Sequence, residues 1–236
     1  MNGHHHQTFL APVLAIILFA GAPSFAEEPP CPKPDPLPIS VMLLAPPCDD
    51  CEETAGELAE LLKLQKLRTP DQAKHATDDS ERTIGRFLDE IGIQIDDQLP
   101  VAGHLFKCIA EAAKDEIRDA KMTFHRTRPY KLPHNGLQFL KELKDDDSFS
   151  YPSGHATYGT IVGLVVAGMI PEKSGKIIKR IGDYGFSRMV AGVHFRSDVY
   201  AGQVAGAAIT TSLFRNEDFR SAFEKARAEV RKSLGY

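Results

Sequence analysis

Apolar residues at helical spacing run through most of this 236-residue chain and constrain its fold more than any other feature. Leu58, Leu61 and Leu62 recur three and four residues apart, as on one face of an amphipathic helix. No stretch alternates with period two for long enough to be a convincing strand. The sequence therefore predicts an all-α, single-domain helical bundle. We expect helices over residues 52–67, 71–91, 101–122, 155–170, 172–190, 197–214 and 217–234, and a short helix near residues 137–143.

One of these expected helices is unusually rich in small residues. Between residues 197 and 212 it carries Ala201, Gly202, Ala205 and Gly206. Small side chains allow two helix backbones to approach closely. This pattern predicts that the helix packs in the centre of the bundle.

The first 26 residues have the pattern of a secretory signal peptide. A 12-residue apolar run over residues 9–20 is too short to span a bilayer, which needs about 20 residues. Ser24 and Ala26 then place small residues at the two positions that a signal peptidase reads. We expect cleavage after residue 26, a periplasmic or secreted mature protein, and no stable membrane insertion.

The mature chain should begin with an extended, proline-rich segment that wraps the body of the protein. Eight prolines lie between residues 29 and 47, so residues 27–51 are expected to be extended and to precede an all-α domain over 52–236. The four cysteines are Cys31, Cys48, Cys51 and Cys108. In an oxidising compartment they predict two disulfides, with three pairings open. For the Cys48–Cys51 pair a structural bridge is favoured over redox catalysis or zinc binding.

The overall charge excludes one class of partner. The formal net charge is -4, which gives no electrostatic footprint for a nucleic-acid polymer. By itself this acidic balance also does not suggest an anionic ligand, so any anion site has to come from a local cluster of cations.

Three short clusters in the second half of the chain carry side chains suited to binding a phosphate group and cleaving its ester. They are Lys121-x6-Arg128-Pro129, Pro152-Ser153-Gly154-His155 and Ser187-Arg188-x5-His194-x3-Asp198. Lys121 offers a compact charge, whereas Arg128 and Arg188 offer planar guanidinium groups that can bind two oxygens at once.

The second and third clusters add groups for catalysis. Ser153 and Gly154 open a helix, so backbone N–H groups and the positive end of the helix dipole face the same anion. His194 and Asp198 are four residues apart and can share a helix face. The carboxylate then fixes the imidazole tautomer and leaves the other nitrogen free to attack. His155 has the right chemistry to protonate the departing alkoxide.

Each cluster also has an ordinary structural interpretation when it is taken alone. Lys121 and Arg128 would be surface cations, since charged side chains mostly lie on surfaces. Ser153-Gly154 would be a helix cap, and His194 with Asp198 a structural hydrogen-bonded pair. The functional interpretation rests on the three clusters occurring together and in order.

Together the three clusters resemble the acid phosphatase signature of the type 2 phosphatidic acid phosphatase superfamily, which also contains vanadium haloperoxidases. The soluble form resembles the bacterial class A non-specific acid phosphatases. The resemblance implies hydrolysis of small phosphate monoesters in two steps, with inhibition by vanadate or inorganic phosphate, and it implies no metal and no cofactor. His194 would form a phosphohistidine, Asp198 would orient it, and His155 would be the general acid. The phosphoryl oxygens would be held by Lys121, Arg128, Arg188, Ser153 and Gly154.

Alternatives remain open within the same pocket chemistry. A vanadate-dependent haloperoxidase would bind vanadate where phosphate sits, and a lipid-phosphate phosphatase shares the motif. An acidic run at Asp145, Asp146 and Asp147 would disfavour highly anionic substrates if it borders the pocket. Small apolar helix faces are compatible with a homodimer.

Overall fold

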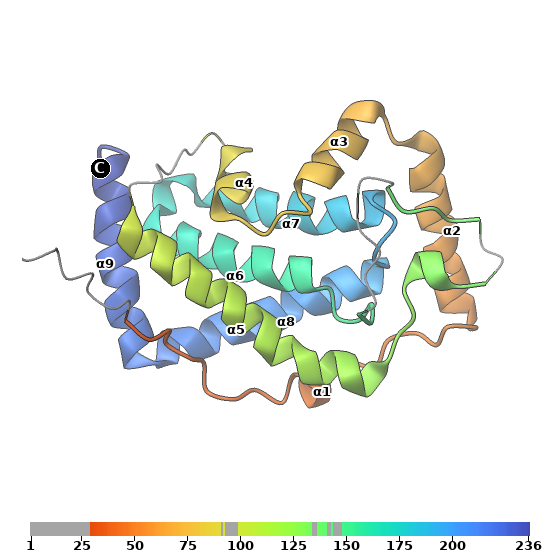
Figure 1. Cartoon of the computed structure of the whole chain (residues 1–236), viewed down its shortest axis with the longest axis horizontal. Coiled ribbons are helices and arrows are strands. Elements are labelled where there is room, and N and C mark those ends of the chain that lie inside the picture. The colour runs from red at the N-terminus through yellow and green to blue at the C-terminus, as the bar shows by residue number, and fades with distance from the viewer. Residues whose placement is uncertain (1–28, 91, 93–98, 134–135, 141–142, 144–147) are drawn as a thin grey trace, which may run out of the picture.

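A computed structural model describes residues 29–90, 92, 99–133, 136–140, 143 and 148–236 of the chain. Within these ranges the chain forms α-helices and short 3₁₀ helices and contains no strand, which confirms the all-α prediction (Figure 1). The α-helices are α1 (Ile39–Met42), α2 (Glu52–Leu67), α3 (Pro70–Asp78), α4 (Ile84–Asp89), α5 (Pro100–Phe124), α6 (Gly154–Met169), α7 (Ser174–Val190), α8 (Arg196–Arg215) and α9 (Glu217–Ser233). The 3₁₀ helices are η1 (Pro129–Lys131) and η2 (Pro171–Lys173).

Helix α6 forms the centre of the bundle, and α5, α7 and α8 pack around it (Figure 1). It is apolar on all sides, as expected for a helix with no solvent-facing stripe. Ile161, Val162 and Val165 have no exposed surface and belong to the main hydrophobic core. No helix in the described ranges is both long enough and apolar enough to cross a membrane.

The small residues of α8 let it approach α6 backbone to backbone, as the sequence predicted. The central helix is nevertheless α6, because α8 exposes Tyr200 and Val204 to solvent. A Cβ atom added to Gly202 would lie 2.5 Å from the Ser153 carbonyl oxygen, and one added to Gly206 would lie 2.7 Å from the Thr157 carbonyl oxygen. Neither carbonyl can move without disturbing the first turn of α6. These two glycines therefore hold the start of α6 against α8.

The prediction of one helix over residues 71–91 is wrong, because the chain leaves the helix after Asp78 and starts α4 at Ile84. Asp79 ends α3 with its side chain fully buried. It accepts two hydrogen bonds from Arg180 of α7, the shorter at 2.6 Å, and one from Arg86 at 3.0 Å. Thr83 then caps α4 by accepting a hydrogen bond from the Arg86 amide.

The short helix expected near residues 137–143 is also wrong for the described part of that segment. Residues 136–140 and 143 are not helical. The Leu140 amide instead donates to the Ala191 carbonyl at 3.1 Å, so this loop packs on the turn between α7 and α8. Within the loop itself, the Leu143 amide donates to the Leu140 carbonyl at 3.0 Å. Residues 145–147, with their three aspartates, lie outside the described residues.

The proline-rich segment lies along the bundle and is tied to it by polar contacts. The Asp35 carbonyl accepts a hydrogen bond from Ser212, and the Lys33 carbonyl accepts one from Asn216. The segment is extended except at the single turn of α1. The expected signal peptide over residues 1–26 lies outside the described residues.

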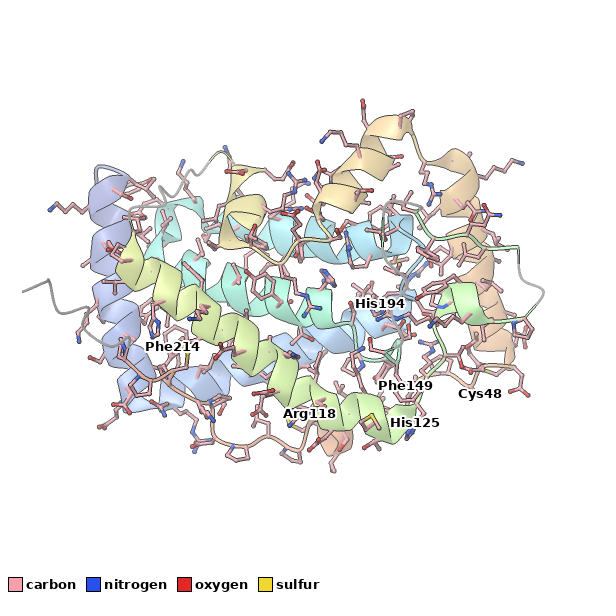
Figure 2. All side chains as sticks on the ribbon, in the orientation of Figure 1. Cys48, Arg118, His125, Phe149, His194 and Phe214 are labelled. Atoms are coloured by element: carbon pink, nitrogen blue, oxygen red, sulfur yellow. A yellow bond between two sulfur atoms is a disulfide. The ribbon has the colours of Figure 1, made fainter. Side chains whose placement is uncertain are left out.

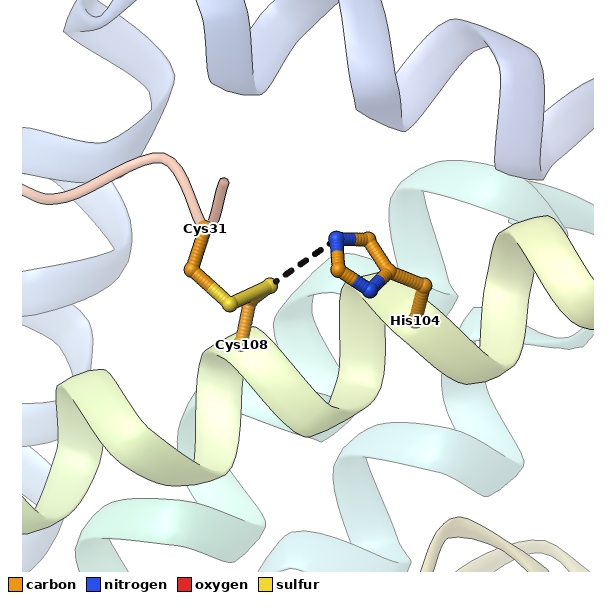
Figure 3. A group of neighbouring side chains, drawn as sticks. All are labelled: Cys31, His104 and Cys108. Atoms are coloured by element: carbon orange, nitrogen blue, oxygen red, sulfur yellow. Dashed lines mark hydrogen bonds between the residues drawn. A yellow bond between two sulfur atoms is a disulfide. The ribbon is translucent and has the colours of Figure 1, made fainter. Parts of the chain in front are cut away.

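One of the two expected disulfides is present. Cys31 of the extended segment is bonded to Cys108 of α5, 77 residues further on (Figure 3). Cys48 and Cys51 are free thiols, so the expected bridge between them is not formed. The Cys51 Sγ is turned toward the Cys48 carbonyl, 2.9 Å away, and toward the Thr54 hydroxyl, 3.8 Å away, at the start of α2.

Candidate active site

A cavity of about 860 Å³ opens between α5, the start of α6 and the end of α7. It brings together residues of all three sequence clusters. The predicted site residues that line it are Lys121, Arg128, Gly154, His155, Arg188 and His194. Ser153 and Asp198 do not line the cavity, and both are fully buried next to residues that do. In Figure 2, His194 lies at the end of the bundle where α7 and α8 meet.

The position of His194 depends on a tight turn after α7. Gly192 adopts a left-handed backbone with φ of 76°, which glycine adopts at low cost. A Cβ atom there would also lie 3.3 Å from the Gln138 carbonyl oxygen. The Val193 amide closes the turn by donating to the Arg188 carbonyl at 3.1 Å. The turn therefore fixes His194 relative to Arg188.

His194 is buried and is held by the carboxylate of Asp198. The Nδ1 atom lies 3.4 Å from Asp198 Oδ2. The same carboxylate oxygen accepts hydrogen bonds from the Ser150 hydroxyl at 2.5 Å and from the Phe195 amide at 2.8 Å. A proton on Nδ1 is the arrangement this carboxylate favours, and it leaves the Nε2 lone pair available for chemistry.

Arg126 completes the support behind His194, and none of the three sequence clusters includes it as a site residue. Its Nη1 donates to Asp198 Oδ1 at 2.7 Å, and its Nη2 donates to Glu57 of α2 at 2.8 Å. Its guanidinium also lies 4.1 Å from the centre of the Phe195 ring. Arg126 stands two residues before Arg128, but an isolated arginine gives no sequence signal that separates a buried partner from a surface cation.

Arg128 lies directly against the predicted nucleophile. Its Nη1 is 3.2 Å from His194 Nε2 and donates to the Val193 carbonyl at 3.0 Å. Its Nη2 donates to the Ser148 hydroxyl at 2.8 Å. The planar guanidinium is therefore held on both edges, which fixes it over the nitrogen that would carry the phosphoryl group.

Arg188 and Lys121 approach the cavity from two other helices. Arg188 of α7 is buried, and it donates to the Ser187 hydroxyl at 3.0 Å and to the Ala76 carbonyl. Burial lowers the pKa of its guanidinium to about 10, so the charge is still present at neutral and acidic pH. The Lys121 ammonium of α5 donates to the Phe149 carbonyl. Three cations thus surround the space in front of His194 Nε2.

The first turn of α6 adds backbone donors to this space. The Ser153 hydroxyl caps the helix by accepting from the Ala156 amide at 3.4 Å. The amides of Gly154 and His155 come next and have no acceptor among the described residues, as is usual at a helix N-terminus. The positive end of the helix dipole therefore lies beside the three cations. Ser153 acts here through its cap and Gly154 through its backbone.

His155 lines the cavity with one ring nitrogen already engaged. Its Nε2 lies 2.8 Å from the Ser80 carbonyl oxygen, so this nitrogen carries a hydrogen and donates it. The other nitrogen, Nδ1, is then the atom that can exchange a proton with a bound molecule. Burial, followed by the charges of Arg188 and Arg82, holds the pKa of His155 well below its usual value.

The electrostatics of the His194–Asp198 pair favour a neutral imidazole next to an ionised carboxylate. Burial, together with the charge of Arg128, lowers the pKa of His194 to about 3. Burial alone would raise the pKa of Asp198, but the hydrogen bond from His194 and the charge of Arg126 outweigh it and lower that pKa to about 2. The imidazole is therefore neutral over the whole physiological range, and its unprotonated Nε2 faces Arg128.

One group of three side chains of the metal-ligating kind gathers within the described residues, where the extended segment meets α5 away from the cavity. It consists of Cys31, His104 and Cys108, with Cys108 Sγ 3.5 Å from His104 Nε2 (Figure 3). Both sulfur atoms belong to the disulfide and cannot act as thiolate ligands. The group does not have the donors of a metal site.

The fold and the site define a class of helical protein with an anion pocket built around a carboxylate-supported histidine. The model of the PAP2 superfamily matches residues 105–221, which include all three clusters. An acid phosphatase of Zymomonas mobilis is 30% identical over 205 residues, covering 84% of this chain and 76% of that protein. The chain belongs to the PAP2 superfamily.

A second relative agrees with this assignment, and a solved structure agrees with the fold. A non-specific acid phosphatase of Providencia stuartii is 30% identical over 176 residues, covering 70% of each chain. Among solved structures, a bacterial vanadium-dependent iodoperoxidase superposes with a TM-score of 0.55 at 14% identity, covering 73% of this chain and 52% of that one. At this identity the last comparison concerns the fold alone.

Proposed function

We propose that this protein is a periplasmic or secreted acid phosphatase that hydrolyses small phosphate monoesters through a phosphohistidine, without a metal. The observation that carries the proposal is the neutral His194, whose Nε2 lies 3.2 Å from Arg128 Nη1 on the wall of a cationic cavity. The names of the related acid phosphatases support the same activity. The apolar run over residues 9–20, followed by small residues at 24 and 26, supports export.

In the first step, the Nε2 lone pair of His194 attacks phosphorus and the bond from phosphorus to the ester oxygen breaks. Protonated His155 gives its Nδ1 proton to the departing oxygen, so the alcohol leaves neutral. Asp198 stabilises the positive charge that develops on the His194 ring. Lys121, Arg128 and Arg188 stabilise the phosphoryl oxygens as their charge redistributes, which is the work a metal ion does in other phosphatases.

In the second step, water attacks the phosphohistidine and the bond from phosphorus to Nε2 breaks. His155, now neutral, takes a proton from the water, and inorganic phosphate leaves. The enzyme returns with His155 protonated and His194 neutral, so protons balance over the cycle. Vanadate should inhibit, since its oxyanion can occupy the same cations and accept the Nε2 lone pair.

The test is the His194→Ala variant. We expect turnover of p-nitrophenyl phosphate to disappear while binding of vanadate survives, because the cations remain in place. The matched control is His75→Ala, on the half-exposed α3 histidine outside this cavity, which should keep full turnover. Residual turnover within tenfold of the unmodified protein would overturn the phosphohistidine mechanism. Loss of turnover in excess chelator would overturn the proposal that the reaction needs no metal.

A further inference from the structure

The wall of the active-site cavity formed by α5 carries more positive charge than one phosphoryl group requires. Lys114, Arg118 and Lys121 are four and three residues apart, so they share one face of α5, and all three line the cavity. Figure 2 labels Arg118 on this helix. Only Lys121 belongs to the set of cations expected to hold the reacting phosphoryl group. Lys114 and Arg118 extend the row away from it.

A further cation joins this wall from a different segment. Arg82, between α3 and α4, also lines the cavity. A Cβ atom added to Gly154 would have as its two nearest neighbours Ile117 Cδ1 of α5, at 3.3 Å, and Arg82 Nη1, at 3.8 Å. Arg82 therefore lies beside the N-terminus of α6 and close to the α5 wall. The excess charge comes from two elements that meet at one place.

Described acidic side chains on the cavity wall do not balance this charge. The Lys and Arg residues that line it are Arg82, Lys114, Arg118, Lys121, Arg128 and Arg188, and Glu81 is the one described carboxylate among the lining residues. Arg82 and Lys114 form no ion pair with a described residue, and Arg118 has only an exposed contact of 3.5 Å with Asp115. By contrast, Lys74 and Lys179 elsewhere on the surface have close carboxylate partners. A concave wall with one sign of charge concentrates anions.

We propose that Lys114, Arg118 and Arg82 form a second anion subsite that takes a second phosphate group of the substrate. This inference rests on the proposed phosphatase function. At 1.5 Å per residue, the row on α5 extends about 10 Å from Lys121 to Lys114. That length suits a substrate of the size of a sugar bisphosphate, with one phosphate group at each end of the row. The preferred substrate class is therefore a bisphosphate, contrary to the effect expected from the aspartates at 145–147, which lie outside the described residues.

The test compares fructose 1,6-bisphosphate with fructose 6-phosphate, which lacks the second phosphate group. The unmodified protein should have the higher kcat/KM for the bisphosphate. In the double variant Lys114→Gln/Arg118→Gln, kcat/KM for the bisphosphate should fall about tenfold or more, because two charge-assisted contacts are lost. For fructose 6-phosphate it should fall less than threefold. Arg82 is left unchanged because it also lies beside His155.

The matched control is Lys225→Gln/Lys232→Gln, which removes the same charge from the exposed face of α9. This variant should keep the preference for the bisphosphate, and thermal melting should show both variants folded. Equal losses on the two sugar phosphates, or no preference in the unmodified protein, would overturn the second subsite. If the unmodified protein hydrolysed neither the sugar phosphates nor p-nitrophenyl phosphate, the proposed function itself would be overturned.

Discussion

Arg126 and Asp198 form a fully buried ion pair directly behind His194, with Arg126 Nη1 2.7 Å from Asp198 Oδ1. The same guanidinium reaches Glu57 of α2, so one arginine connects the Asp198 carboxylate to the outer helix. A buried charge that loses its partner is costly, because water cannot replace the lost contact. Arg126 is therefore a positioning residue whose removal should affect both stability and the protonation of the site.

The Arg126→Met variant tests this relationship. We expect a loss of about 3–5 kcal/mol in the free energy of unfolding, measured with urea, since Asp198 is left buried without its counterion. Without that charge the pKa of Asp198 rises, so the low-pH limb of kcat/KM should move to higher pH. The double variant Arg126→Met/Asp198→Asn should recover much of the lost stability. An unchanged pH profile in the single variant would reduce Arg126 to a purely structural role.

Arg128 should not be replaceable by lysine. An ammonium is a single point of charge and cannot contact Ser148, Val193 and His194 Nε2 in the fixed arrangement that the guanidinium has. We expect kcat/KM for p-nitrophenyl phosphate to fall by roughly 10- to 100-fold in Arg128→Lys, as for loss of one oxyanion contact. The exposed Arg215→Lys serves as the control and should be unaffected. Full activity of Arg128→Lys would argue against two-point recognition by this arginine.

The sequence was sufficient for features that depend on local pattern. The helix predicted over 52–67 coincides with α2, and the glycines predicted to allow close packing are the ones that contact α6. Of the predicted site residues, His155 and His194 come to one cavity although 39 positions separate them. The order and spacing of the clusters were enough to predict that these side chains share one site, and their chemistry stays a prediction.

The features that the sequence could not supply depend on contacts between distant segments. The break after α3 follows from Asp79 pairing with Arg180, 101 residues away, and the pattern of apolar residues before it gives no sign of that. The role of Arg126 depends likewise on Asp198 being 72 residues away in sequence and 2.7 Å away in space. The number of cysteines does not decide their pairing either, since only the fold shows that the Cys51 thiol faces the Cys48 carbonyl.

The Cys31–Cys108 disulfide should contribute substantially to stability. It closes a loop across 77 residues, and constraining an unfolded loop of that length is worth about 4 kcal/mol in the chain-entropy description. We expect Cys31→Ala/Cys108→Ala to lower the melting temperature by roughly 8–16 °C. The control Cys48→Ser/Cys51→Ser removes two thiols that form no bridge and should change it little. Equal effects of the two double variants would contradict the pairing.

The pH dependence of kcat/KM should give an acidic optimum. The proposed mechanism requires neutral His194, whose pKa is lowered to about 3, and protonated His155, whose pKa lies well below its usual value. Activity should therefore rise as His194 loses its proton near pH 3. It should fall as the pH rises through the lowered pKa of His155, below about 6.5. A flat profile from pH 5 to 8 would contradict this assignment of roles.

Arg82 supplies part of the charge that lowers the pKa of His155. Replacing Arg82 therefore tests the role of His155 as general acid, because the direction of the resulting pKa shift is known. In Arg82→Gln the imidazolium is less repelled and the pKa of His155 rises. The high-pH limb of kcat/KM should then move to higher pH. Since p-nitrophenyl phosphate is used throughout, its own ionisation is the same in every profile. Lys114→Gln removes one positive charge from the same cavity wall, but Lys114 is not among the charges that lower the pKa of His155 most. It should shift the limb less, and a shift to lower pH in Arg82→Gln would exclude His155 as the general acid.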